Sequence, residues 1–300
     1  MGKMFFILLV LVLPAGAQVQ ARLEVADGTT PTVRLLVPEV QMVIAARDRH
    51  GRPRADLDAA QIQILDNGAA APVTSFEPAA GLPLRIALLL DGSESMKAGF
   101  AAERQAGLAL LGQARNWGAV RTFSMVFAAS DAESCGTTSG AISAGKTEGQ
   151  TALYDALIRA ARVLASPSPA RRVLLLLSDG EDNYSRASLA EVIAALQQWN
   201  IVVYSVTTHS SRLEFPGDRV LRQIAAATGG RAYLVSTYSH AGKALAGIEN
   251  EARGQYVVGF RPAGRLTEGE FHSVKIVVSG TKIRARAGYY VSRESGVRSR

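Results

Sequence analysis

The chain has 300 residues, of which 48% are hydrophobic and 20% are charged. These proportions exclude a disordered chain, and the length suits about two globular domains. The formal net charge is +7, and the last 48 residues alone carry ten Lys and Arg against three Glu. No nucleic-acid motif accompanies this charge, so we expect no nucleic-acid partner. The single cysteine, Cys135, excludes an intrachain disulfide and a thiolate zinc site.

The first residues predict a secretory signal peptide over residues 1–17. Lys3 precedes an apolar run over residues 4–13, and the small residues that follow form an A-x-A-like cleavage site. The run is about half as long as a bilayer-spanning helix. We therefore expect cleavage near Ala17 and Gln18, a secreted or periplasmic protein, and no transmembrane segment in the mature chain.

Residues 18–80 are expected to form a small β module. Strand-like patterns run over residues 33–48 and 61–65. Asn67 and Gly68 follow the second run, and this dipeptide is typical of a tight β-hairpin because both residues accept a positive φ. No helix of normal length is predicted here, apart from one short helical turn ahead of the second run.

From residue 84 to 251, short apolar strands alternate with helical segments. This alternation predicts the α/β class, with mostly parallel strands joined by crossover helices in an open, doubly wound sheet. The expected strands over residues 86–90 and 173–177 lack polar alternation, which is typical of strands buried on both faces. The expected strands cover residues 86–90, 122–127, 173–177, 202–206 and 232–235. The expected helices cover residues 98–115, 153–164, 188–199, 219–227 and 241–251.

The strand pattern returns over residues 255–293, but these runs are too few for a stable domain of their own. We expect them to pack with the N-terminal strands, with the α/β domain inserted between the two halves of one module. Lys282, Arg284 and Arg286 alternate with apolar residues, which predicts one basic strand face. We interpret this face as solvated, with an acidic polysaccharide or a membrane surface as the alternative ligand. Residues 294–300 are expected to be frayed.

Oxygen-bearing side chains follow two of the buried strands and precede one helix. Asp91, Ser93 and Ser95 follow the first strand, Asp179 follows the third, and Thr151 precedes a helix. Ligands of doubly wound sheets bind beyond the carboxyl ends of the strands, so these groups are expected to converge. Carboxylates, hydroxyls and water suit a small hard cation, Mg²⁺ first, with Mn²⁺ or Ca²⁺ as alternatives. An ion held partly by neutral hydroxyls keeps positive charge that attracts an acidic group of another molecule.

These residues resemble the D-x-S-x-S, Thr and Asp elements of the von Willebrand factor A domain, in the same order along the α/β segment. The resemblance implies a metal-ion-dependent adhesion site in which Ser93, Ser95 and Thr151 contact the ion directly. Asp91 and Asp179 then assist, often through water. The flanking β stretches are similar to those of a group of exported bacterial proteins. The resemblance gives a site but no partner. From the charge that the ion keeps, we expect a protein partner that presents a carboxylate, and we expect no catalytic residue.

The same residues leave other interpretations open. Ser, Asp and Gly are also typical of turns and helix caps. In a structural module of an envelope assembly, the metal stabilises the fold alone. A metal-dependent phosphohydrolase would use Asp91 as its nucleophile, but Ser93 stands where such enzymes place a second Asp, and a hydroxyl is a poor proton shuttle. Residues 181–183 are interpreted as a solvated loop, and the four scattered histidines as neither metal ligands nor bases.

Overall fold

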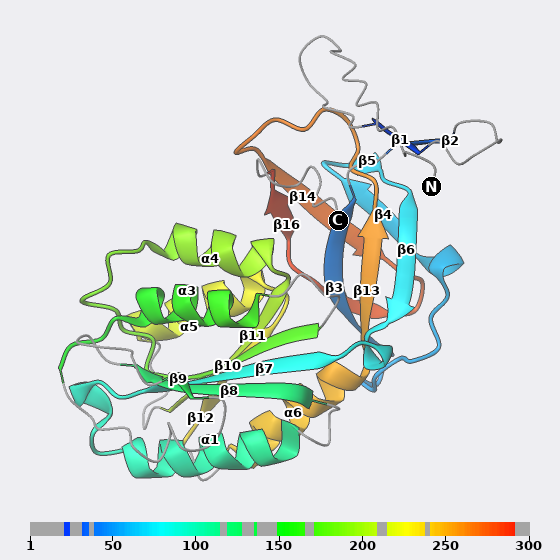
Figure 1. The fold of residues 1–300 in the computed structure, drawn as a ribbon. Helices are drawn as coiled ribbons and strands as arrows, with labels where there is room; N and C mark the ends of the chain where they lie inside the picture. Colours follow the sequence, from blue (N-terminus) through cyan, green and yellow to red (C-terminus); the bar gives the residue numbers. More distant parts are fainter. Residues whose placement is uncertain are drawn as a thin grey trace, which may run out of the picture.

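The computed structural model describes residues 21–24, 32–35, 39–114, 119–127, 135–136, 149–165, 171–208, 215–237 and 241–291. The predicted signal peptide and frayed tail lie outside these residues. Figure 1 shows an α/β domain and, at one end of its sheet, a module of antiparallel strands. A separate two-stranded ladder pairs β1 (Ala21–Glu24) with β2 (Thr32–Leu35).

The α/β domain is built on a six-stranded sheet with the order β12-β11-β10-β7-β8-β9. Its strands are β7 (Leu84–Asp91), β8 (Ala119–Phe127), β9 (Cys135–Gly136), β10 (Arg171–Leu177), β11 (Ile201–Thr208) and β12 (Arg231–Val235). All neighbouring pairs are parallel except β8 with β9. The chain runs outward from β7 to β9 and returns to the other side of β7 at β10. The strand order therefore reverses between β7 and β10.

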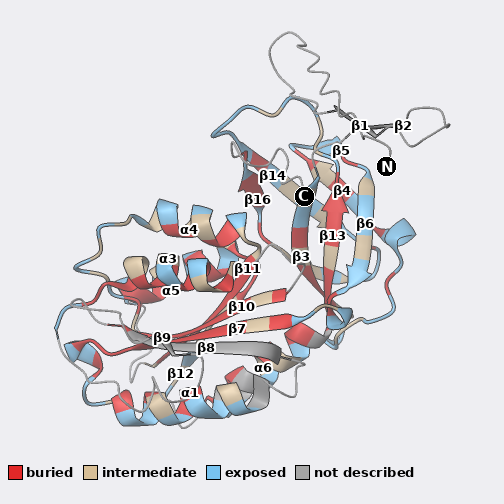
Figure 2. Cartoon of the chain, viewed as in Figure 1, coloured by how far each residue is buried: buried red, intermediate tan, exposed pale blue. Residues whose placement is uncertain are grey.

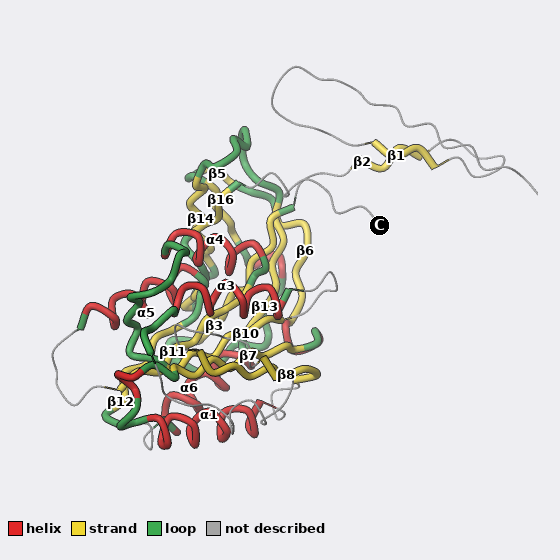
Figure 3. Tube along the Cα trace, turned by 60° about the vertical axis from the view of Figure 1, so that its left-hand side comes forward, coloured by secondary structure: helices red, strands yellow, loops and turns green. Residues whose placement is uncertain are grey.

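Helices cover both faces of this sheet (Figures 1 and 3). The helices α1 (Phe100–Ala114) and α6 (Gly242–Arg253) lie on one face, and α3 (Leu153–Leu164), α4 (Leu189–Gln198) and α5 (Pro216–Ala227) lie on the other. A hydrophobic core lies on each face of the sheet, and successive residues of β7 pack into opposite cores. Leu88 packs on the face of α1 and α6, and Leu89 packs on the face of α3, α4 and α5. The central strands are therefore buried on both sides, as Figure 2 shows. No helix of the described residues has the length and hydrophobicity of a bilayer span.

The β module contains two four-stranded sheets, in the orders β15-β3-β13-β6 and β16-β14-β4-β5. Its strands are β3 (Val40–Arg47), β4 (Gln63–Asp66), β5 (Ala69–Ala70), β6 (Val73–Pro78), β13 (Gln255–Phe260), β14 (Phe271–Val277), β15 (Lys282–Arg284) and β16 (Gly288–Tyr290). Each sheet combines strands from before and after the α/β domain, around one shared core. The strands that flank the domain pair directly, with Pro78 opposite Tyr256. The predicted fold class, including a module of N- and C-terminal strands, is confirmed.

Local sequence signals account for three features of this fold. Asn67 and Gly68 have φ angles of 48° and 83°, and they form the tight turn between β4 and β5. Ser188 is the N-cap of α4, where its side chain accepts a hydrogen bond from the Glu191 amide in a capping box. Asp58 caps the short 3₁₀ turn Ala59–Gln61 in the same way.

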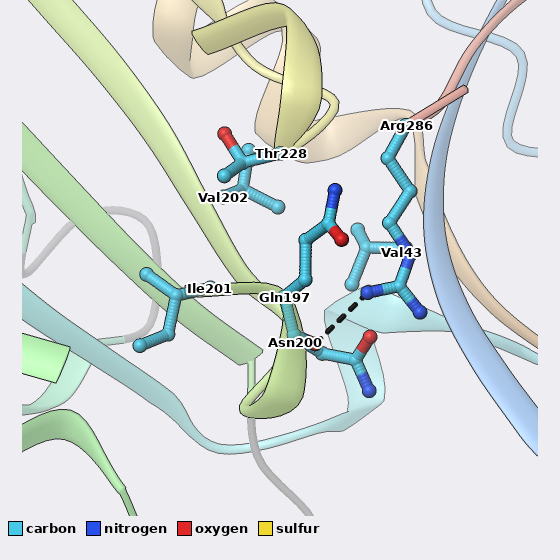
Figure 4. Close-up of a pocket in the computed structure, with 7 residues that line it drawn as sticks. All are labelled: Val43, Gln197, Asn200, Ile201, Val202, Thr228 and Arg286. Carbon is cyan, nitrogen blue, oxygen red and sulfur yellow. Dashed lines mark hydrogen bonds between the residues drawn. The ribbon is translucent and has the colours of Figure 1, made fainter. Parts of the chain in front are cut away.

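The predicted basic strand face is wrong for Arg286. This residue lies beyond β15 and is 8% exposed, because it packs between the module and the end of α4. Its Nη1 donates to the Gln197 carbonyl at 2.9 Å, and its Nη2 donates to the Gln41 carbonyl at 3.0 Å. Figure 4 shows the side chain reaching toward Gln197 and Asn200. Burial lowers the pKa of the Arg286 guanidinium to about 10.

Candidate metal centre

The predicted carboxylates lie on either side of the point where the strand order reverses. β7 ends at Asp91, and its neighbour β10 ends two residues ahead of Asp179. Both segments therefore leave the same edge of the sheet, at the position where doubly wound folds bind ligands. The module lies at the opposite end of these strands (Figure 1).

A chain of hydrogen bonds joins four of the five predicted residues. The Ser93 amide donates to Oδ1 of Asp91 at 3.0 Å. The hydroxyls of Ser93 and Ser95 lie 3.0 Å apart, and the Ser95 hydroxyl donates to Oδ2 of Asp179 at 2.9 Å. Asp91 and Ser93 are buried, while Ser95 is exposed. The arrangement therefore runs from the interior of the domain to its surface.

Backbone contacts bring the loop that carries Thr151 to the same edge. The Glu94 amide donates to the Gly149 carbonyl at 3.2 Å, and Gly149 has a φ of 79°, which glycine adopts without strain. The Thr151 amide donates to Oδ1 of Asn183 at 2.8 Å. Thr151 is 3% exposed. In the described part of the chain, no hydrogen bond joins its hydroxyl to the other four residues.

The loop over residues 181–183 holds the first turn of α3 in place. Oδ1 of Asp182 accepts hydrogen bonds from the Tyr154 amide at 3.2 Å and from the Ser185 hydroxyl at 2.6 Å. Glu181 and Asn183 are exposed, as expected for a solvated loop. Asn183 nevertheless fixes the position of Thr151 through its amide, so the loop also has a positioning role.

Two further residues contact Asp91 and were missed by the sequence analysis. The Ser178 hydroxyl donates to Oδ2 of Asp91 at 2.6 Å and accepts a hydrogen bond from the Gly180 amide at 3.0 Å. Oε1 of Glu103, on α1, accepts from the Asp91 amide at 2.8 Å. The sequence offered one signal for each residue. Ser178 stands directly before Asp179, and Glu103 is an acidic residue about one helical turn after Phe100.

Burial controls the electrostatics of this edge. It raises the pKa of Asp91 to about 6, although hydrogen bonds from Ser178 and Ser93 act in the opposite direction. It raises the pKa of Glu103 to about 9, and the charges of Asp91 and Asp179 add to this effect. In the described residues, no Lys or Arg forms an ion pair with Asp91 or Asp179. A positive charge beside these carboxylates would lower the pKa of Asp91 and favour its ionised form.

The donor set fits a hard divalent cation. Among the described residues, no group of three or more His, Cys, Asp and Glu lies together as a metal site. The oxygen donors at this edge are two carboxylates and the hydroxyls of serine and threonine. Carboxylate and hydroxyl oxygens are ligands that suit Mg²⁺, Mn²⁺ or Ca²⁺. The residues that would hold such an ion are Asp91, Ser93, Ser95, Thr151 and Asp179.

Solved structures with similar folds come from several organisms. An aerotolerance-related membrane protein from Bacteroides fragilis is 18% identical over 56% of this chain and 98% of its own, with a TM-score of 0.42. A von Willebrand factor type A protein from Catenulispora acidiphila is 12% identical over 86% of this chain and 75% of its own, with a TM-score of 0.47. Proximal thread matrix protein 1 from the mussel byssus, with a zinc-occupied MIDAS motif, is 18% identical over 62% of this chain and 49% of its own, with a TM-score of 0.47.

A search of curated proteins found no match. The sequence model of the von Willebrand factor type A domain matches residues 86–246. The match begins in β7 and ends in α6, so it covers the doubly wound sheet with its helices. Because it spans more than half of the chain, the chain belongs to the von Willebrand factor type A domain family.

Proposed function

We propose that this protein is an exported binding protein, which captures an acidic group of a protein partner through a divalent cation, Mg²⁺ first. One observation carries the proposal. Two carboxylates and a row of hydroxyls meet where the strand order reverses, and in the described residues no basic side chain pairs with either carboxylate. A cation provides the charge that the protein leaves out.

The residues have distinct roles in this proposal. The hydroxyls of Ser93, Ser95 and Thr151 contact the ion, while Asp91 and Asp179 support it directly or through water. When bound, the ion supplies positive charge and a coordination position that a partner carboxylate can occupy. Because the direct ligands are mostly neutral, part of the ion's charge remains for the partner.

The surface next to the site has room for a partner. An open hollow of about 310 Å³ lies beside Ser95 and Asp179, and Met96, Thr208 and Phe215 also line it. The Phe215 side chain is 41% exposed. Large exposed apolar side chains beside a polar anchor are typical of protein interaction surfaces. This hollow is the proposed contact area around the captured carboxylate.

The proposal is binding, and not catalysis, because the residue two positions after Asp91 is Ser93. A hydroxyl near neutral pH does not shuttle protons efficiently, so the pair lacks the acid/base partner of a phosphohydrolase. Export to a secreted or periplasmic location is part of the proposal. It rests on the predicted signal peptide over residues 1–17, which lies outside the described residues.

Replacement of Thr151 tests the cation site. We expect Thr151→Ala to weaken Mg²⁺ binding by about tenfold or more, because a hydroxyl ligand is lost while its small apolar replacement leaves the fold intact. Isothermal titration calorimetry measures the affinity, and circular dichroism checks the fold. Thr74→Ala, in the edge strand β6, is the matched control. A Thr151→Ala protein that is folded and binds Mg²⁺ as tightly as the parent contradicts the site.

Affinity capture tests the role of the cation in partner binding. Immobilised protein is incubated with envelope extract of the native host, with Mg²⁺ or with EDTA. The proposal expects a partner that is retained with Mg²⁺ and released by EDTA, and that Thr151→Ala fails to retain. Equal capture under both conditions, by a protein that does bind Mg²⁺, would favour the alternative of a purely stabilising metal.

A further inference from the structure

Three arginines from separate elements converge on one buried carboxylate. The carboxylate lies at the junction of the α/β domain, from here on called the A domain, and the β module. Glu251, near the end of α6, is 1% exposed. Its Oε2 lies 2.9 Å from Nη2 of Arg47 on β3, 3.6 Å from Nη2 of Arg231 on β12, and 3.5 Å from Nε of Arg284 on β15. The guanidinium groups are therefore close neighbours, although they are distant in sequence.

The positive charge of this cluster exceeds what Glu251 neutralises. Lys282 stands opposite Arg47 in the antiparallel pair of β15 with β3, so both side chains lie on the same sheet face. Like charges at directly opposed positions destabilise a sheet. Within the described residues, Arg47, Arg231 and Arg284 form ion pairs with Glu251 alone. Three arginines thus share one carboxylate, and Lys282 adds a fourth positive charge opposite Arg47.

The arginines also keep many donors without a protein acceptor. Each guanidinium has five N–H groups. Arg47 uses its Nη2 on Glu251, Arg231 adds the Tyr233 ring at 5.9 Å from its Cζ, and Arg284 adds a bond of 3.4 Å to the Gly230 carbonyl. The side chains of Arg47, Arg231 and Arg284 are 23%, 37% and 40% exposed. Nε of Arg231 is buried without a hydrogen-bond partner among the described residues, so the donors that an anion can reach belong to the exposed parts of the three side chains.

We propose that Arg47, Arg231, Lys282 and Arg284, here called the basic junction, bind a sulfate or phosphate monoester group of an acidic polysaccharide. The planar fork of a guanidinium matches the oxygens of such a group in bidentate fashion, and a lysine adds a flexible point charge. The three arginines belong to strands of both folded parts of the molecule, and their side chains are partly buried. A flexible polymer can bring a single anionic group to partly buried side chains, whereas a flat bilayer favours protruding side chains.

This site is separate from the proposed cation site. The basic junction lies at the module end of the sheet, and Asp91 lies at the opposite end of β7 (Figure 1). EDTA therefore leaves the basic junction intact while it removes any divalent cation. Binding measured in EDTA consequently reports on this inference alone.

Charge reversal of Lys282 tests the inference. Lys282 is exposed and forms no ion pair with Glu251, so Lys282→Glu leaves the buried contacts in place. The probe is dextran sulfate in EDTA, with neutral dextran as the blank. Lys275→Glu, at an exposed position of β14, is the control with the same change of net charge. We expect Lys282→Glu to weaken dextran sulfate binding by about fivefold or more, the loss of one charge-assisted contact, and Lys275→Glu by much less.

Two further measurements complete the test. Inorganic sulfate is expected to weaken the binding of the parent protein to dextran sulfate more than chloride does at equal ionic strength. The inference is overturned if dextran sulfate fails to bind to the parent protein, or if Lys282→Glu and Lys275→Glu weaken its binding equally. Binding to phosphatidylglycerol vesicles without binding to dextran sulfate would also overturn it, in favour of a membrane surface.

Discussion

Asp91 depends on two neighbours outside the predicted ligand set. A carboxylate with no exposed surface loses its hydration, so it needs fixed donors to stay ionised. Ser178 supplies such a donor at 2.6 Å, and Glu103 fixes the backbone of the same residue by accepting its amide proton at 2.8 Å. The orientation of Asp91 toward the serines is thus set by contacts from the residue that follows β10 and from α1.

The Ser178→Ala substitution is expected to lower the free energy of unfolding by about 1–3 kcal/mol, because it leaves a buried carboxylate oxygen and the Gly180 amide without their partner. Urea denaturation in EDTA measures this effect without any contribution from a bound cation. Ser279→Ala, in an exposed turn, serves as the matched control. Equal stability of the two variants would contradict a positioning role for Ser178.

At this scale, the sequence predicted the oxygen donors but not what holds them. Asp91, Ser93 and Ser95 are recognisable because they follow an apolar strand at alternate positions. Glu103 is not, because its contact with Asp91 depends on how α1 packs against β7. His272 is a similar case, since its Nδ1 lies 2.9 Å from Oδ1 of the buried Asp66, a pairing between strands that are distant in sequence.

Among the elements, α4 shows how local chemistry fixes a helix start. Oε2 of Glu191 accepts from the Ser188 amide at 2.7 Å and from its hydroxyl at 2.8 Å, while the Ser188 hydroxyl accepts from the Glu191 amide at 3.3 Å. These bonds satisfy backbone donors that a helix otherwise leaves unpaired at its first turn. The pattern of Ser followed three residues later by Glu predicted this start.

The cap has a measurable pH dependence. Ser188→Ala is expected to cost about 1 kcal/mol of stability at neutral pH. Hydrogen bonds from Ser188 lower the pKa of Glu191 below its usual 4.5. Because the folded pKa is depressed, the stabilisation is present above pH 4.5 and is lost as the pH falls through the folded pKa. Urea denaturation measures the free energy of unfolding of the parent and of Ser188→Ala, and the difference between the two should be smaller in acid than at neutral pH. A difference that does not change with pH would contradict a contribution of the ionised Glu191 to the cap.

Element boundaries were predictable where periodicity is strong. The expected helix over residues 153–164 coincides with α3, because one face of this segment is continuously apolar. Helix α5 starts earlier than expected, at Pro216, since proline is well suited to the first helical position. β9, Cys135–Gly136, was missed because two residues are too few for any period to appear.

For the whole molecule, Arg286 joins the two parts. It donates to Gln41 of the module and to Gln197 of the A domain. We expect Arg286→Ala to lower the free energy of unfolding by about 2–4 kcal/mol, because two carbonyls at the junction lose their donors. Chemical denaturation measures the loss, with Arg265→Ala on an exposed loop as the control. If Arg286→Ala loses no more free energy of unfolding than Arg265→Ala, the stability of the junction does not depend on Arg286.

The direct pairing of β6 with β13 has a consequence for the order in which the protein folds. β6 comes before the A domain in the chain and β13 comes after it, and Pro78 stands opposite Tyr256 in their pairing. The entire A domain therefore forms the connection of this antiparallel pair. Closing a long flexible chain is entropically costly and slow. Once the A domain has folded, it holds these two strands close together, and only a short closure remains. The folded A domain thus brings β6 and β13 together. β3 and β6 lack their shared partner β13, and β4 lacks its partner β14, until the residues that follow the A domain have been synthesised.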